Sequence, residues 1–332
     1  MAIKIYNKGG SVAVEDGTDI ILSRFGYYAE GNNITILDKD NDNQTWNVNY
    51  ADIQNSSGAS VGASVGAVLD YIGALSTAEV TSLDYKTEVA LGRIANSSIV
   101  NKFGYNNDID SGTEEIISSF GGAFNPLTNI ITTAQTVTIT YNNTTEGVGQ
   151  TGARLLLIDY LDANSELATA YHTLSTTGSD TSAFTCLGIN RVVVVQFGAS
   201  ATNVNDITLT ATTDTTIQAR IPALKSVTQQ CLYHVPIGQT FLMDYIKVSA
   251  LKISGGGGVP TVNIKGFSFS RVTLGQYSIF DIEIDTSIEN NIEFNLNNPI
   301  KFTGREVIYF TGDTDINNTK VSMRFSGLQI LS

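Results

Sequence analysis

The chain has 332 residues, of which 42% are hydrophobic and only 15% are charged, and its net charge at pH 7 is −13. This length exceeds one small domain and favours two or more domains with sizeable cores. The acidity, together with the lack of any cluster of Lys and Arg, argues against nucleic-acid binding.

Neither an export signal nor a membrane span is expected. Residues 1–10, "MAIKIYNKGG", lack the long apolar core of a signal peptide. The longest apolar runs, such as "RVVVVQF" at 191–197, are strand-sized and well short of a membrane-spanning helix. Cys186 and Cys231 are the only cysteines and form no CxxC pair. We expect both to be buried reduced thiols, which suits assembly in a reducing cytoplasm.

Residues 1–55 read as short strands. The pair Asp16-Gly17 between apolar runs is a strong hairpin signal. Two further runs, "NITIL" and "TWNVNY", flank an aspartate-rich stretch. The second run alternates, with one face formed by Trp46, Val48 and Tyr50. A small sheet with one buried face is therefore predicted.

The stretch "SSGASVGASVGAVLDYIGAL" has the periodicity of an amphipathic helix. Its apolar stripe consists of Val61, Val65, Val68, Leu69, Ile72 and Leu75. Because its glycines weaken an isolated helix, it must dock on the sheet. Residues 1–76 are thus predicted to be a small β-rich domain with one helix.

Residues 77–100 are predicted to be a short helical connector. Ser76 and Glu79 have the S-x-x-E spacing of a capping box. Apolar positions then follow at steps of three and four: Val80, Leu83, Thr87, Ala90 and Ile94. Two readings stay open, a helix packed on its own domain and a short self-associating stalk.

From residue 101 onwards the pattern is nearly all strand, with turns rich in Gly, Asn and Asp. The clearest candidates are 135–141, 153–161, 191–197, 206–212, 216–222, 227–236, 241–253, 261–272, 277–285, 291–296, 306–310 and 320–331. This succession predicts a large antiparallel β-sandwich or jelly-roll region in a mainly β protein. We divide it into lobes at 101–222 and 223–332, packed together near residues 222–240.

Asp38, Asp40 and Asp42 begin a stretch in the way a calcium-binding loop begins. Counted from Asp38, however, the positions that require Gly and Glu hold Asn43 and Asn49. A polar hairpin tip is therefore favoured, with the three aspartates as the only candidate ligands if an ion binds.

The strand "FDIEID" places Asp281, Glu283 and Asp285 on one face. Successive carboxylates on a strand face lie about 6.6 Å apart, near the spacing of glycosidase acid–base pairs. The favoured alternative is a solvated outer face at a sheet edge, where charges prevent edge-to-edge association.

The remaining candidates for chemistry are weak. His172 and His234 are the only histidines, and neither lies in a nucleophile-elbow motif. Cys231 and His234 would point to opposite faces of a strand. The run "SGGGG" at 254–258 lacks the Lys of a phosphate loop and is predicted to be a loop between strands.

Exposed aromatic side chains are a further possibility for glycan recognition. The examples in this chain are Tyr105, Tyr160 and Tyr277. The sequence does not separate them from core aromatics. We assign no catalytic, metal or cofactor-binding residue and expect no cofactor.

Several short motifs occur in order between residues 100 and 332. They are "NKFGYNNDID" (101–110), "TGAR" (151–154), "LDAN" (161–164), "INRVVV" (189–194), "NVNDIT" (203–208) and "VPIGQT" (235–240). In order and spacing the chain resembles a family of virion structural proteins of tailed bacteriophages. Residues 1–75 resemble, less specifically, the attachment domains of phage fibre and head-decoration proteins.

The resemblance implies a non-enzymatic, homo-oligomeric component of the particle, located in the virion and assembled in the bacterial cytoplasm. The first hypothesis is a trimeric head-fibre or decoration protein that docks on the capsid or another virion protein through residues 1–76. Two alternatives remain: a tail-associated protein that binds a host surface glycan, and a glycan-cleaving enzyme that uses Asp281 and Glu283. None of these involves nucleic acid or membrane insertion.

Overall fold

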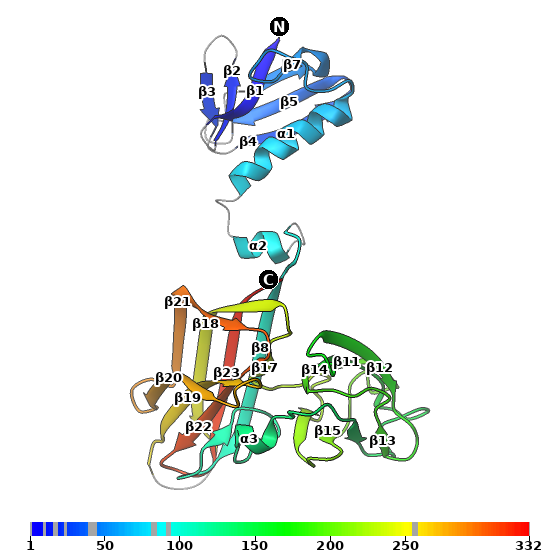
Figure 1. Ribbon diagram of the computed structural model, residues 1–332, viewed down its shortest axis with the longest axis vertical. Helices are drawn as coiled ribbons and strands as arrows, with labels where there is room; N and C mark the ends of the chain where they lie inside the picture. The colour runs from blue at the N-terminus through cyan, green and yellow to red at the C-terminus, as the bar shows by residue number, and fades with distance from the viewer. Residues whose placement is uncertain are drawn as a thin grey trace. The chain divides into compact units, whose positions relative to one another are not determined.

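The computed structural model divides into two compact units, Met1–Ile94 and Ala95–Ser332 (Figure 1). It describes residues 2–8, 11–15, 19–22, 25–38, 45–80, 85–90, 94–253 and 258–331. Strands account for 57% of the structure and helices for 7%, which confirms the predicted mainly β fold. Within the described residues, every helix is too short or too polar to cross a lipid bilayer.

In its described residues the first unit contains two sheets, the long helix α1 (Val65–Val80) and the short helix α2 (Tyr85–Ala90). One sheet has the order β3-β2-β1-β7 and the other the order β4-β5-β6. Their bounds are β1 (Ile3–Lys8), β2 (Ser11–Glu15), β3 (Asp19–Leu22), β4 (Phe25–Glu30), β5 (Asn33–Asp38), β6 (Thr45–Asn49), the 3-10 turn η1 (Tyr50–Asp52) and β7 (Ile53–Gln54). In β6, Trp46 is buried while Asn47 and Asn49 are exposed, which agrees with the predicted alternation.

Helix α1 (Val65–Val80) covers the core of this unit. It begins after Ser64, whose Oγ accepts a hydrogen bond from the N–H of Ala67 at 3.3 Å. Val68 and Ile72 are completely buried against the strands, as the apolar stripe predicts. The hydroxyl of Tyr71 donates to the carbonyl of Ile5 at 2.7 Å and so fixes the helix to β1.

The predicted start of a second helix at Ser76 is wrong. Helix α1 continues through Ser76 to Val80 without interruption, so Ser76 is an interior residue of this helix and not the cap of another. A separate helix, α2, spans Tyr85–Ala90. Leu83 lies outside the described residues, so the proposed a/d seam stays a prediction.

The second unit is built around a β-sandwich formed by the ends of its sequence. The strands are β8 (Ser97–Ile109), β9 (Glu115–Ile116), β17 (Leu232–His234), β18 (Gln239–Lys252), β19 (Thr261–Ser270), β20 (Gln276–Asp285), β21 (Asn291–Thr303), β22 (Glu306–Thr314) and β23 (Thr319–Leu331). One sheet has the order β21-β18-β23-β8 and the other β17-β22-β19-β20, with the short β9 also paired to β22.

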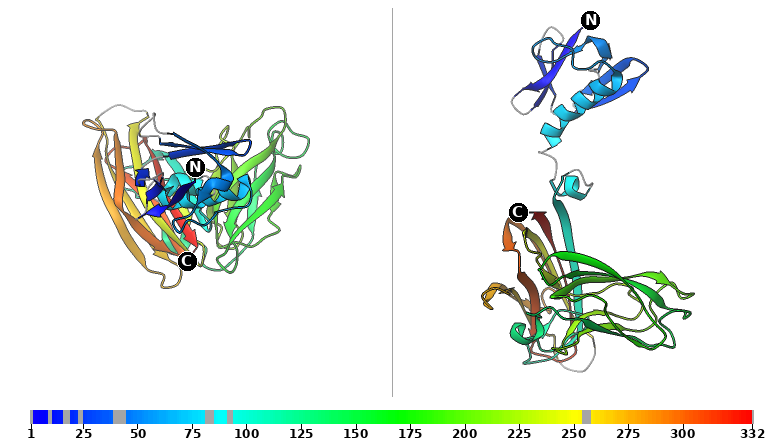
Figure 2. Two further views of the ribbon diagram at one scale, coloured as in Figure 1. Left: turned by 90° about the horizontal axis from the view of Figure 1, so that it is seen from above. Right: turned by 45° about the vertical axis from the view of Figure 1, so that its right-hand side comes forward.

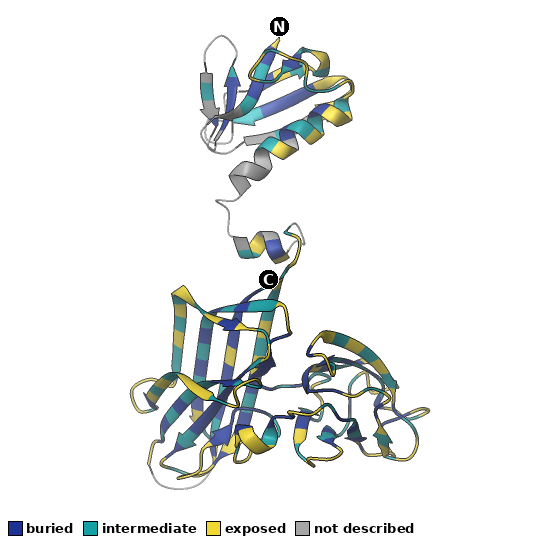
Figure 3. Cartoon of the chain, in the orientation of Figure 1, coloured by how far each residue is buried: buried dark blue, intermediate teal, exposed yellow. Residues whose placement is uncertain are grey.

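This strand order is that of a jelly roll. If β8 and β17–β23 are numbered one to eight along the chain, the two sheets read 6-3-8-1 and 2-7-4-5. The two sheets enclose a core of aliphatic and aromatic side chains that includes Phe241, Phe310 and Phe325. Buried residues alternate with partly exposed residues along β19 in Figure 3, as expected where each sheet has one face on the core.

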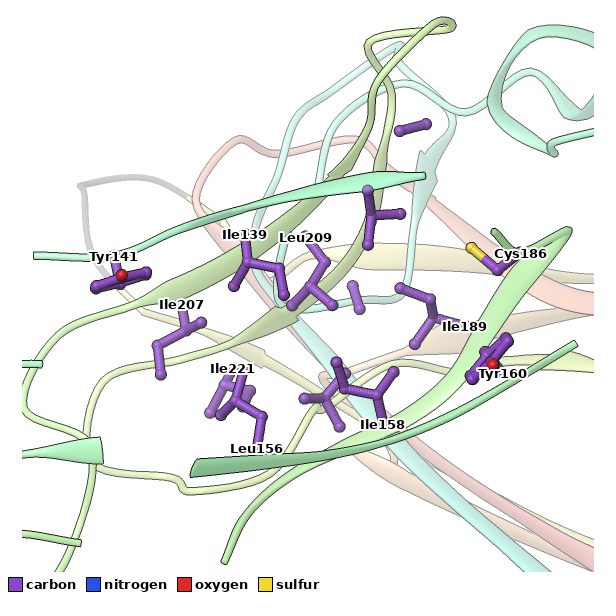
Figure 4. Close-up of a cluster of buried hydrophobic side chains, with 14 of the residues drawn as sticks. Ile139, Tyr141, Leu156, Ile158, Tyr160, Cys186, Ile189, Ile207, Leu209 and Ile221 are labelled. Carbon is purple, nitrogen blue, oxygen red and sulfur yellow. The ribbon is translucent and has the colours of Figure 1, made fainter. Parts of the chain in front are cut away.

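A second sandwich is inserted between the first two strands of the jelly roll. It contains β10 (Val137–Thr140), β11 (Ala153–Leu161), β12 (Leu167–Thr173), β13 (Ser179–Thr181), β14 (Gly188–Phe197), β15 (Ile207–Ala211) and β16 (Ile217–Ile221), preceded by the one-turn helix α3 (Pro126–Asn129). Its sheets, β13-β10-β15-β16 and β12-β11-β14, enclose a separate core in which Leu156 and Ile158 face Ile139, Leu209 and Ile221 (Figure 4). We call this part the inserted lobe.

The predicted boundary of the first lobe at residue 101 is wrong. Strand β8 pairs along its length with β23, and β9 pairs with β22, so both belong to the jelly roll. The error arises because the partner of β8 lies at the other end of the chain, which local patterns do not reveal. The last residue of the inserted lobe's core is Ile221.

Candidate functional site

The two lobes of the second unit meet along β14, whose Asn190 is bonded to His234 of β17. Both views of Figure 2 show the green strands of the inserted lobe beside the jelly roll. Between Asp159 and Tyr160 of β11, the register of β14 passes from Arg191 to Ile189. Asn190 is therefore the extra residue of a β-bulge. Its side-chain Nδ2 donates to the carbonyl of His234 at 2.9 Å, and its Oδ1 accepts from the His234 N–H at 2.8 Å. One amide thus joins β14 to β17.

The bulge also turns the backbone carbonyl of Asn190 towards β8. Lys102 of β8 donates a hydrogen bond from Nζ to this carbonyl. The pKa of Lys102 is lowered to about 8, chiefly by burial; Arg191 acts in the same direction, whereas Cys231 and Asp159 act in the opposite direction. At neutral pH this lysine is still mostly protonated, so a positive charge lies at the junction of the lobes.

A groove with a volume of about 460 Å³ opens above this lysine. One wall is the edge strand β8 over residues 99–103, and the opposite wall is formed by β11, β12 and β14 of the inserted lobe. Residues 227–230 and Tyr233 form the floor. We call this feature the interlobe groove.

The rim of the interlobe groove combines apolar and charged side chains. Phe103 of the jelly roll and Leu167 of the inserted lobe both line the groove and are 48% and 49% exposed. Arg191 is exposed, and Asp159 is half-buried and accepts a hydrogen bond from the hydroxyl of Thr169 at 3.1 Å. Two cationic groups and one carboxylate therefore line a groove in an otherwise acidic chain.

Gln230 on the floor carries an unused acceptor. This residue is only 1% exposed, and its Nε2 donates to the carbonyl of Ile189 at 3.0 Å. Its Oε1 is buried, and within the described part of the chain no group donates to it. Unpaired buried carbonyl oxygens are uncommon in native proteins, and this one lies beneath the surface of the groove with almost no exposed area of its own.

His234 and Arg271 form a second connection behind the groove. The guanidinium of Arg271 donates to the carbonyl of Ile131 at 3.1 Å, to that of Leu187 at 2.6 Å and to Nδ1 of His234 at 2.9 Å. Burial, followed by the charges of Arg271 and Lys102, holds the pKa of His234 well below its usual value. His234 is therefore a neutral structural residue, as the sequence favoured.

A second hollow, of about 500 Å³, lies between Phe120 and Pro222 and contains several carboxylates. Glu115 is buried and accepts hydrogen bonds from the side chain of Asn106 and the N–H groups of Asp110 and Gly122. Asp206 pairs with Arg220. These carboxylates therefore have structural partners.

The acids of "FDIEID" occupy the solvated face predicted for them. Asp281, Glu283 and Asp285 are exposed, while Ile284 is buried in the jelly-roll core. Strand β20, which carries them, is the edge of its sheet. Lys265 lies opposite Asp281 in the neighbouring strand. This arrangement fits the protective edge better than an acid–base pair.

His172 and the two cysteines also have structural surroundings. His172 lies 3.4 Å from Asp180, which further accepts from the hydroxyl of Tyr141 at 2.6 Å and the N–H of Ser175 at 3.0 Å. Partial burial raises the pKa of Asp180, but these hydrogen bonds outweigh burial and leave it below the usual value. The expectation of two buried, unpaired thiols is confirmed. Burial raises the pKa of each to about 12.

The three candidate tyrosines lie in different surroundings. Tyr160 is a core residue stacked on Phe184, with ring centroids 4.1 Å apart. Tyr105 lines the second hollow, and Tyr277 is 56% exposed on β20. The structure therefore does not bring them together into one binding surface.

Two predicted loops fall mainly outside the described residues. Asp38 ends β5, whereas Asp40 and Asp42 are not described, so the metal question stays a prediction. Of the run at 254–258, only Gly258 is described. In the part of the chain that the structure describes, no group of three or more His, Cys, Asp or Glu side chains is placed to hold a metal ion.

Sequence reasoning missed the residues of the interlobe groove, namely Lys102, Asp159, Asn190, Arg191 and Gln230. They come from distant segments and carry no recognisable spacing. The one available signal was that "NKFGYNNDID" and "INRVVV" carry the family resemblance, and both stretches contribute to the groove.

No protein-family model matches the sequence, and no curated protein matches it significantly. Among solved structures, the chain has weak similarity to virion proteins of infectious bursal disease virus. The VP2 subviral particle is 13% identical, with 70% of this chain and 72% of that chain covered and a TM-score of 0.21. The T13 viral particle is 11% identical, with coverages of 70% and 69% and a TM-score of 0.20. Overlap of this size does not show a shared fold.

Proposed function

We propose that this protein is a non-enzymatic structural component of a tailed-phage virion, either a head fibre or a decoration protein. The observation that carries the proposal is the strand order of the second unit, a jelly roll with a second sandwich inserted between its first two strands. Jelly rolls are common in capsid and lectin domains. Fold alone does not determine function, so the ordered phage-like motifs between residues 101 and 240 supply the second support.

The first unit suits the role of an anchor. It has its own core, in which residues from both sheets pack against Val68 and Ile72 of α1. Contacts divide the chain after Ile94, so this unit forms a compact body separate from the jelly roll. We assign docking on the capsid, or on another virion protein, to residues 1–76 within it.

The outer face of sheet β12-β11-β14 supports self-association. Tyr171, Leu157 and Val193 lie opposite one another on the three strands and form an apolar row across that face. Tyr171 is 69% exposed. Contiguous apolar surface of this kind is typical of protein interfaces, and we propose that a homotrimer covers it.

The test of the oligomer is the native mass of the purified full chain at micromolar concentration. We expect three times the mass of the 35.6 kDa chain, and a Tyr171→Asp variant should shift the population towards monomer. A matched exposed tyrosine on the jelly-roll edge, Tyr277→Asp, should leave the mass unchanged. A wild-type monomer would contradict the trimer.

A receptor-binding role remains the second candidate, and the interlobe groove is the observation that favours it. The groove is compatible with a structural protein that also contacts the host surface. Multivalent display on a particle would strengthen a modest affinity at each site.

A further inference from the structure

We infer that the interlobe groove binds a carboxylate-bearing sugar unit of a polysaccharide, with Lys102 and Arg191 holding the carboxylate. The inference rests on the proposed virion role only for the source of the ligand, a host surface glycan. The site itself is argued from the groove.

The charges of the groove select an anion. Among the described residues Lys102 donates to one acceptor, the Asn190 carbonyl, whereas an ammonium has three N–H donors. Arg191 adds an exposed guanidinium at the rim, suited to bind a carboxylate with two parallel hydrogen bonds. Asp159 is the one carboxylate that lines the groove, so the three side chains together carry a net charge of about +1. One ligand carboxylate brings the groove to neutrality.

The carboxylate of Asp159 selects hydroxyls. Among the described residues it accepts one side-chain hydrogen bond, from the hydroxyl of Thr169 at 3.1 Å, and it has room to accept more. A ligand carboxylate by itself has no donor to offer Asp159. Sugar hydroxyls donate and accept at once, so a sugar acid satisfies the cations and Asp159 together.

The shape of the groove fits a pyranose ring. Phe103 and Leu167 present apolar surface at the rim, and Val100 and Val227 present it further in. The C–H face of a sugar ring packs on such surfaces while its edge makes hydrogen bonds. The volume of about 460 Å³ admits a sugar unit with part of its neighbour, as a polysaccharide requires.

The test measures binding of D-glucuronic acid to the full chain by calorimetry or ligand-observed NMR. We expect saturable binding with a Kd of about 1 mM, typical of a single sugar in an open site. D-glucuronamide, which has the same shape without the charge, should bind at least about tenfold more weakly. Acetate, a carboxylate without hydroxyls, should also bind at least about tenfold more weakly.

Two variants locate the site. Lys102→Met and Arg191→Gln should each weaken glucuronic acid binding by about tenfold or more. The second changes an exposed rim residue, so it keeps the test valid if the first variant fails to fold. Lys247→Met is the matched control, because Lys247 pairs with Glu293 at 3.3 Å on the neighbouring β18 and β21, outside the groove.

The pH dependence gives a readout that a purely structural lysine would not produce. The pKa of Lys102 is about 8 under the influence of burial, Arg191, Asp159 and Cys231. As the pH rises from 7 to 9 the ammonium loses its proton, so affinity for glucuronic acid should fall. In Lys102→Met this fall should disappear.

Undetectable binding of glucuronic acid, or equal affinity for acetate, would overturn the inference. So would unchanged binding in both groove variants. Native mass measured on the same sample separates this outcome from the proposed function. A trimer that does not bind glucuronic acid contradicts only the proposed binding site. A monomer that binds glucuronic acid contradicts the proposed trimer but supports the binding site.

Discussion

At the residue scale, Asn190 joins the two lobes through both its backbone and its side chain. As the extra residue of a β-bulge, it offers its backbone carbonyl to Lys102 and its side chain to the backbone of His234. The side-chain amide substitutes for a backbone partner, so two buried groups of β17 are satisfied across the lobe boundary. Asn has the right length and both a donor and an acceptor, which explains why an amide stands here.

We expect Asn190→Ala to reduce the free energy of unfolding by about 2–4 kcal/mol, because it leaves the N–H and carbonyl of His234 buried without partners. Urea denaturation of the full chain measures the change. Asn295→Ala, at an exposed position of β21, should stay within about 0.5 kcal/mol of the wild type. Equal effects of the two substitutions would show that Asn190 does not couple the lobes.

His234 makes stability depend on pH with a definite sign. Its pKa in the folded protein is well below the value of about 6.5 in an unfolded chain, because it is buried and faces Arg271. The unfolded state therefore binds the proton more readily, and the free energy of unfolding falls as the pH drops below about 6.5. Above that pH the contribution is fully present.

NMR tests this directly, since the chain has only two histidines. His172→Asn assigns the remaining imidazole Hε1 signal to His234, which should show no titration between pH 8 and about 5.5. A midpoint near 6.5 would contradict a buried neutral imidazole. In urea, the wild type should lose more stability over this range than His234→Gln.

At the element scale, β20 shows how an edge strand is kept from pairing. Its outward face carries Asp281, Glu283 and Asp285, and its inward face carries Ile282 and Ile284. A row of like charges makes approach of a second edge unfavourable, whereas the alternation keeps the inner face apolar.

We expect Asp281→Val with Glu283→Val to cause association of the folded protein beyond the native oligomer. Light scattering measures it, and circular dichroism confirms that the fold persists. Glu166→Val with Glu289→Val removes the same charge from exposed positions outside strands and should not associate further. If both double variants associate to the same extent, the loss of net charge explains the association, and the position of the acids on β20 does not.

The local sequence pattern predicts strand positions well where apolar residues mark the buried face of the strand clearly. The apolar-rich run 153–161 coincides with β11, and 261–272 and 320–331 match β19 and β23 within a few residues. Strand β8 was not predicted as a strand, because its sequence "SSIVNKFGYNNDI" contains Gly and several Asn, which have low strand propensity.

Long-range pairing set the limit of prediction. Strand β8 is stabilised by β23, and Gly104 within it is required by a close approach, since an added Cβ would lie 2.4 Å from the N of Cys231. The interlobe groove depends on the same pairing. The residues that line it are far apart in the sequence and lie close together only when β8, β14 and residues 227–230 pack in the folded chain.

At the scale of the whole molecule, the chain combines a small β domain with a jelly roll that carries an insertion. Each of the two units has its own buried core. The inserted lobe is tied to the jelly roll by Asn190, Arg271 and Gln230, so we expect these two lobes to unfold together.

Calorimetry should therefore show that the fragment 95–332 melts in one transition at the temperature it has in the full chain. The reason is that the cores of the two units share no residue. A fragment that is unfolded, or that melts more than about 5 °C lower, would show that the first unit contributes to the stability of the second.

The central claim is that this chain is a structural part of a virion, and cryo-EM of the particle that carries it tests this most directly. We expect trimers at symmetric positions, with residues 1–76 against the particle and the jelly roll with its inserted lobe fitting the projecting density. A well-resolved particle that contains no symmetric copies of the chain, together with the absence of the chain from the purified virion by quantitative mass spectrometry, would contradict a structural role in the virion.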